Sequence, residues 1–120
     1  MTLRMLDSIT VANLPVGADA YLGYVDGRFA TFPALKRAFP ASHLLDLAVF
    51  SSGDATGCDC EPGDLRPDQV PGWVARQIAR GVYRPVVYAS ASAMPGVLAV
   101  MEAAGIHRSL VRVLTAHYGA

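Results

Sequence analysis

The sequence has 120 residues, of which 52% are hydrophobic and 17% charged, and its formal net charge is zero. This length fits one domain, and the hydrophobic fraction supports a packed core and excludes an intrinsically disordered chain. The balanced charge offers no attraction for nucleic acid or an anionic membrane, so we expect neither as a partner. The chain shows no signal-peptide pattern and no apolar run of the roughly 18 residues that a membrane helix needs.

Short apolar segments typical of strands recur along the chain. We expect strands, in chain order, at residues 5–7, 21–27, 43–51, 58–61, 84–90 and 109–118. Several of these segments are apolar almost throughout, which indicates parallel strands that are covered on both faces.

Helical patterns separate most of these segments. Residues 32–39 predict a short helix, and Val70, Val74 and Ile78 recur every four residues before a stop at Gly81. A third helix is expected within residues 92–105, with Ser92 as its cap and Gly105 as its stop. Its apolar residues follow the spacing i, i+3, i+4 and i+7.

This alternation predicts an α/β fold with a mostly parallel sheet of about six strands. Two architectures remain open. A doubly wound sheet would be complete at this size, whereas a (β/α)8 barrel typically needs about 250 residues, so the chain would form a partial TIM-barrel-like arc. Residues 1–120 then form one incomplete barrel domain.

Polar residues cluster where the predicted strands end, and in parallel α/β folds the ligand site lies at those ends. Any one of them can instead be an ordinary capping or loop residue, which is the simpler interpretation of Asp26 and Ser52. The residues that we expect at the site are Asp7, Tyr24, Asp26, Asp59, Glu61, Tyr88, Ser90, His117 and Tyr118.

The stretch GCDCEPGD, residues 57–64, combines two thiols with three carboxylates. If it is extended, Asp59 and Glu61 share the face toward the cavity, while Cys58 and Cys60 point into the layer between sheet and helices. A zinc site would need two more ligands at a fitting spacing, so we expect buried, inert thiols and no metal or other cofactor. Two neighbouring carboxylates suit acid–base chemistry, because crowded like charges keep one of them protonated.

These segments together resemble the glycoside-hydrolase-like barrels related to family 25 lysozymes, in the form common in actinobacteria and their phages. The matching stretches are MLDS (5–8), GYVDGR (23–28), DCEPGD (59–64), RPVVYAS (84–90) and TAHY (115–118). The resemblance implies a (β/α)8 barrel that cleaves or binds a cell-wall polysaccharide. It also implies two strands beyond the sixth, so this chain would be truncated relative to the family barrel.

The resemblance gives Asp7, Asp59 and Glu61 catalytic places, with Glu61 as the general acid of a lysozyme-type hydrolase. Asp59 or Asp7 would stabilise the oxocarbenium-like transition state, and Tyr24, Tyr88 and Tyr118 would stack on sugar rings. Two alternatives stay open. One is a non-catalytic carbohydrate-binding or structural module, and the other is a nucleotide-binding sheet, against which the absence of a glycine-rich phosphate loop counts.

An incomplete barrel has unpaired strand edges, which invite self-association. The sequence leaves the cellular location open, and action outside the cell or with a phage is compatible with it.

Overall fold

The computed structural model describes residues 5–7, 20–27, 30–39 and 43–116. The strands are β1 (Met5–Asp7), β2 (Ala20–Tyr24), β3 (His43–Ala48), β4 (Gly57–Asp59), β5 (Val86–Ser90) and β6 (Arg112–Ala116). The helices are α1 (Phe32–Ala38), α2 (Val70–Ala79) and α3 (Met94–Ala103), with short 3-10 helices η2 (Pro67–Gln69) and η3 (Arg108–Leu110). None of the described helices has both the length and the apolar character to cross a membrane.

The strands form one sheet in the order β1-β2-β3-β4-β5-β6, and every neighbouring pair is parallel. The predicted α/β class with a parallel sheet is therefore confirmed. A doubly wound sheet has its first strand in the interior and reverses its strand order there. Among the described strands β1 lies at an edge and the order does not reverse, so these strands do not form a doubly wound sheet.

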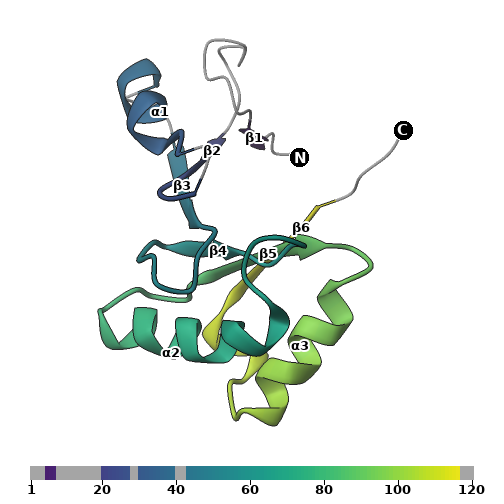
Figure 1. Cartoon of the computed structure of the whole chain (residues 1–120). Helices are drawn as coiled ribbons and strands as arrows, with labels where there is room; N and C mark the ends of the chain where they lie inside the picture. Colours follow the sequence, from purple (N-terminus) through teal and green to yellow (C-terminus); the bar gives the residue numbers. More distant parts are fainter. Residues whose placement is uncertain (1–4, 8–19, 28–29, 40–42, 117–120) are drawn as a thin grey trace.

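Helices α2 and α3 lie side by side against β4, β5 and β6, whereas α1 lies apart from them beside β2 and β3 (Figure 1). The main core is formed where α2 and α3 meet the sheet. Its fully buried members include Ala48, Cys58, Trp73, Val74, Val87, Ala89 and Val97. Because side chains alternate along a strand, Asp59 and Tyr88 belong to the opposite face of the sheet.

The predicted helix stops are confirmed, and two local expectations are wrong. Gly81 follows α2 with φ 96°, and Gly105 follows α3 with φ 84°, a left-handed conformation that glycine adopts without strain. Ser92 does not cap α3, because the N-cap is Ala93, whose N–H donates to Ser90 Oγ at 3.2 Å. The strand expected from residue 109 begins only at Arg112, since the preceding residues form η3.

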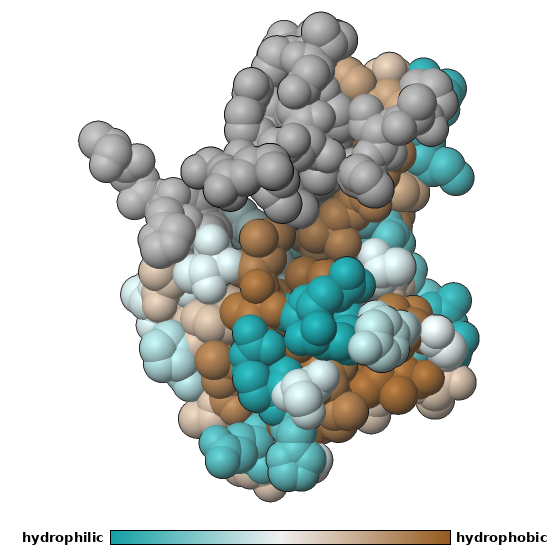
Figure 2. Space-filling model, turned by 180° about the vertical axis from the view of Figure 1, so that it is seen from behind, coloured by the Kyte–Doolittle hydropathy of each residue, from teal (hydrophilic) through white to brown (hydrophobic). Residues whose placement is uncertain are grey.

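Apolar surface remains exposed on several elements. Figure 2, which views the molecule from behind, shows hydrophobic residues between hydrophilic patches, below the grey atoms. Among the residues that the structure describes, the exposed large apolar side chains are Phe50, Ile78, Tyr83, Val100 and Leu110. They come from loops and outer helix faces, so they do not form part of the core.

A substitution at Gly57 tests how closely β4 is packed between β3 and β5. A Cβ added there would lie 2.6 Å from Leu47 Cδ2 and 3.1 Å from Val86 Cβ. We expect Gly57→Ala to lower the free energy of unfolding by about 1–3 kcal/mol, because an added methyl group in a tightly packed core forces neighbouring side chains and backbone to shift. Denaturant unfolding measures this change.

Gly96→Ala is the matched control, because Gly96 is exposed on α3 and a Cβ there meets nothing within 4 Å. This control should raise stability by about 0.5–1 kcal/mol through helix propensity. Equal effects of the two substitutions would contradict the packing of β4.

Candidate functional site

The last residue of β4 and the turn that follows it gather the acidic residues of the candidate site; we call residues 59–64 the acidic turn. Its backbone is fixed at three points. The Cys60 N–H donates to the Tyr88 carbonyl at 2.7 Å, the Asp64 N–H to the Glu61 carbonyl at 2.9 Å, and the Leu65 N–H to the Asp59 carbonyl at 3.2 Å. Gly63 has φ 90°, so the chain reverses there and returns Asp64 toward the end of β4.

Asp59, Glu61 and Asp64 therefore form one carboxylate cluster, which we call the acidic triad. One oxygen from each of them lies within 4.8 Å of the others. Asp59 is only 2% exposed, whereas Glu61 and Asp64 are half-buried. The triad thus joins one deeply buried carboxyl group to two that solvent can reach.

Burial and neighbouring charge change the protonation of the triad. The pKa of Asp64 is raised, first by burial and then by the negative charge of Glu61, with a further contribution from Asp26. A side-chain hydrogen bond with Asp59 acts in the opposite direction. Two carboxyl groups can hydrogen-bond to each other only when one carries a proton, so the triad is suited to holding a proton.

Within the described residues, the carboxylates of the triad also resemble part of a cation site. Carboxylate oxygens are the ligands that Ca²⁺ and Mg²⁺ prefer, and the oxygens are close enough together to face one ion. The cations require six or more oxygen ligands, which the triad alone does not supply.

Both thiols are buried, as the alternation of side chains predicted, but only Cys58 is separated from the pocket. Cys58 and Cys60 both belong to the core cluster under α2 and α3. Cys60 also lines the pocket beside Glu61 and Asp64. The alternation fails here because β4 ends at Asp59, so Glu61 lies in a turn and not in an extended strand.

The tyrosines predicted for the site lie at different places. Tyr88 on β5 is the direct cross-strand partner of Asp59 and is half-buried, so it borders the triad. Tyr24 ends β2, where its N–H donates to Thr31 Oγ1 at 3.2 Å. The predicted His117 and Tyr118 lie outside the described residues.

The other predicted polar residues have structural contacts. Asp26 Oδ1 accepts a hydrogen bond from the Val49 N–H at 2.7 Å, and Ser90 Oγ accepts one from Ala93. Asp7 ends β1 and pairs with Leu22, so β2 and β3 separate its strand from β4.

Asp64 is the site residue that the sequence interpretation did not place. It belongs to the same stretch as Asp59 and Glu61, but an extended strand would have carried it away from them. The signal was the Pro62-Gly63 pair, which is typical of a tight turn and would have brought Asp64 back toward Asp59.

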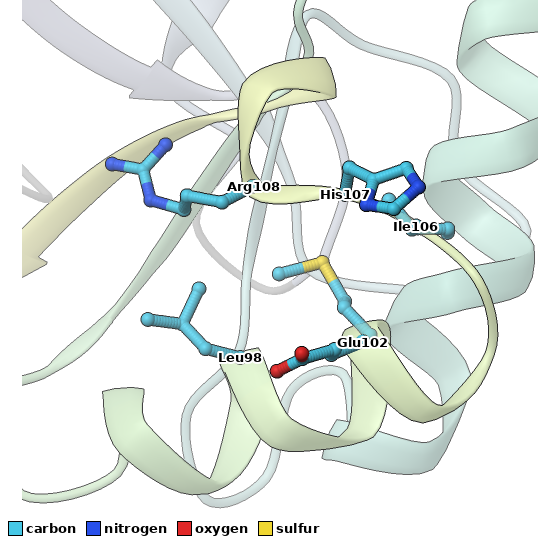
Figure 3. Close-up of a pocket in the computed structure, with 6 residues that line it drawn as sticks. Leu98, Glu102, Ile106, His107 and Arg108 are labelled. Carbon is cyan, nitrogen blue, oxygen red and sulfur yellow. The ribbon is translucent and has the colours of Figure 1, made fainter.

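One pocket lies next to the triad, and a larger one lies elsewhere on the described surface. The pocket beside the acidic turn has a volume of about 220 Å³ and is lined by Glu61, Asp64, Leu65, Arg66 and Ala93, among others. A larger one of about 350 Å³ lies between α3 and η3. In that pocket His107 and Arg108 point in opposite directions above α3, which contributes Leu98, Met101 and Glu102 to the lining (Figure 3).

No protein-family model, curated protein or solved structure matches this chain. The functional assignment therefore depends on the chemistry of the acidic turn itself.

The environment of the thiols predicts that they are inert in the folded protein. Burial raises the pKa of Cys58 far above its ordinary value, and burial together with nearby carboxylates raises the pKa of Cys60 to about 11. Since the thiolate is the reactive form, we expect neither cysteine to react with a thiol reagent near neutral pH until the protein unfolds. Titration with Ellman's reagent, with and without guanidinium, checks this, and rapid labelling of the native protein would contradict it.

The raised pKa of Asp64 predicts a pH dependence of stability. The folded protein holds this proton more tightly than the unfolded chain does, so the resulting stabilisation is fully present below the unfolded-state pKa and is lost as pH rises through the folded-state pKa. Asp64→Asn has no proton to lose. We expect the stability of the wild type relative to Asp64→Asn to fall as pH rises above the ordinary aspartate pKa of about 3.9.

Chemical denaturation of both proteins at several pH values measures this difference. The pKa of Asp54 is lowered by hydrogen bonds from Gln77 and Arg76, so its contribution to stability increases with pH. This contribution is the same in both proteins and cancels in the comparison. A difference that does not vary with pH would show that Asp64 titrates normally.

Proposed function

We propose that this protein is a glycoside-hydrolase-like domain that acts on cell-wall polysaccharide and that its sheet is an arc of a (β/α)8 barrel. The observation that carries the proposal is the acidic triad at the carboxyl end of β4. In parallel α/β folds this is the end of the sheet at which substrates bind. Parallel strands in chain order, with helices against one face, are the arrangement that a barrel arc requires.

Hydrolysis of a glycosidic bond needs a proton for the leaving oxygen and negative charge near the developing oxocarbenium ion. Glu61 is half-buried at the pocket, where it can reach a substrate and act as the general acid. Asp59 is buried beside it and supplies the negative charge. Asp7 is a further candidate for this role, on the opposite side of an arc that closes toward β4.

Aromatic side chains near the strand ends suit a carbohydrate ligand. Tyr88 borders Asp59, and Phe50, in the loop after β3, is 51% exposed. Flat aromatic faces pack against the apolar faces of sugar rings, so these side chains would position a polysaccharide along the sheet end.

A non-catalytic carbohydrate-binding module is the second candidate. The observation that favours it is the size of the pocket at the triad, about 220 Å³, which is below the about 300–1,000 Å³ typical of small-molecule sites. A shallow pocket fits the binding of one sugar unit better than the enclosure of a reacting chain. Binding without hydrolysis would identify this case.

The sheet edges support a proposal about assembly. Within the described strands, β1 pairs only with β2 and β6 only with β5. Unpaired edges are sites where strands of another molecule add, so we propose that the protein associates with itself through them. Sedimentation analysis over a range of protein concentrations tests this, and a single monomeric species throughout would exclude it.

Glu61→Gln tests the catalytic proposal. Glutamine keeps the shape of the side chain but has no proton to donate, and general acid catalysis is typically worth on the order of 10²–10⁴-fold. We therefore expect this variant to lose most of the release of sugar from purified cell walls. Circular dichroism checks that the variant folds.

Glu102→Gln is the matched control, because Glu102 is exposed on α3 at the larger pocket, away from the acidic turn. The control should keep full activity. A folded Glu61→Gln protein with wild-type activity would exclude Glu61 as the acid. A wild-type protein that binds cell walls but releases no sugar would favour the binding module.

A further inference from the structure

Three arginine side chains meet at the amino ends of β5 and β6; we call Arg84, Arg108 and Arg112 the arginine cluster. Arg84 lies two residues before β5, Arg108 begins η3, and Arg112 begins β6. The parallel pairing of β5 with β6 sets Arg112 opposite Val86 and so brings these segments together. The cluster therefore lies at the opposite end of the sheet from the acidic triad, which gathers at the carboxyl end of β4.

Hydrogen bonds to backbone oxygens hold the cluster together. Arg84 Nη2 and Arg108 Nη1 both donate to the Val111 carbonyl, at 3.3 Å and 3.0 Å. Arg112 Nε donates to the Arg84 carbonyl at 2.9 Å. Two guanidinium groups thus converge on one oxygen atom, and the third is attached to the backbone of Arg84.

No carboxylate of the described residues pairs with the cluster. The ion pairs in this part of the chain are made by Arg66, Arg76 and Arg80. Glu102 is exposed and lines the same pocket as Arg108, but the two side chains form no ion pair. Positive charges held close together repel each other, so the folded protein favours a negative charge at this place.

Arg84 carries two further costs that point to a ligand. Its Nε is buried and has no hydrogen-bond partner among the described residues, which is unfavourable for a charged group. Its backbone has φ 52°, a left-handed conformation that is strained for a residue with a side chain. Such strain is typical of positions where a side chain is held ready for a ligand, and the charge of a bound anion would offset the cost of the buried Nε.

We propose that the arginine cluster is an anion-binding site and that its ligand is a terminal phosphate group. Each guanidinium group offers five N–H donors, and the described residues accept one hydrogen bond from each, so donors remain for a ligand. Arg108 and Arg112 are exposed, so an ion can reach them from solvent. This site is separate from the acidic triad and does not rest on hydrolysis of a polysaccharide.

The chemistry of arginine favours phosphate over other anions. The planar guanidinium group presents paired donors that match the oxygens of phosphate, and the resulting hydrogen bonds are charge-assisted. A terminal phosphate carries about two negative charges at neutral pH, which suits three arginines better than the single charge of a carboxylate. His107 points away from Arg108, so the positive charge of the site comes from the arginines (Figure 3).

Titration of the complete chain with inorganic phosphate at constant ionic strength tests the site. The NMR signals of the arginine Nε–H groups report each side chain separately. We expect the signals of Arg84, Arg108 and Arg112 to shift along one saturable curve, while that of Arg37, exposed near the end of α1, stays unchanged. Equal shifts with chloride, or an equal shift at Arg37, would show only screening of surface charge and would overturn the proposal.

Arg108→Gln removes one charge and its paired donors from the site, with Arg37→Gln as the matched control. We expect the dissociation constant for phosphate to rise about tenfold or more in Arg108→Gln, because hydrogen bonds to charged groups are the ones lost. Arg37 forms no ion pair among the described residues, so its substitution removes the same charge and should leave the constant unchanged. If Arg108→Gln does not fold, Arg112→Gln takes its place. Wild-type affinity in the folded variant would overturn the proposal.

Dimethyl phosphate distinguishes a terminal phosphate from a phosphate inside a polymer. It carries a single negative charge and has two of its oxygens blocked, so we expect it to bind about tenfold more weakly than inorganic phosphate or not at all. Equal affinity for the two probes would overturn the assignment to a terminal phosphate. Absence of saturable binding of inorganic phosphate by the wild type would overturn the site itself.

Discussion

Strand β4 has only three residues, Gly57 to Asp59, and all three are buried. It pairs with β3 on one side and β5 on the other, so it has no room for a side chain at Gly57 and no solvent at Cys58. Its last residue carries a carboxyl group into this closely packed environment. The core, the sheet and the acidic turn therefore meet in one short segment, and each constrains the others.

Burial of Asp59 has an electrostatic cost, and it also affects the neighbouring carboxyl groups of the acidic turn. A carboxylate removed from water is costly unless it is hydrogen-bonded or neutralised. Burial and the negative charge of Glu61 raise the pKa of the neighbouring Asp64, so the cost is shared within the acidic turn.

Most of the fold could be predicted from the sequence, because strand and helix patterns differ strongly in period. The order of elements and the stops at Gly81 and Gly105 followed from this periodicity and from glycine. The start of β6 could not, because Leu110 in η3 and Val111 precede the strand with the same apolar character. A local pattern does not show where the pairing with β5 begins.

The site was predicted less completely than the fold. The opposite faces of Asp59 and Cys58 followed from alternation, which holds as far as the strand extends, whereas Glu61 lies in the turn beyond it. Asp64 was missed because a turn brings it back toward Asp59, and side-chain alternation does not apply beyond the end of β4. The arginine cluster joins segments far apart in the chain, and no local pattern encodes it.

The chain contains one tryptophan, and this residue is Trp73, whose indole is buried in the core and donates to the Gly53 carbonyl in the loop between β3 and β4. Its fluorescence is therefore a built-in optical reporter of the loop. Release of the loop would change the polarity and hydrogen bonding of the indole while the sheet stays intact. Loop opening and global unfolding would then give separate spectral changes, without a dye or an introduced label.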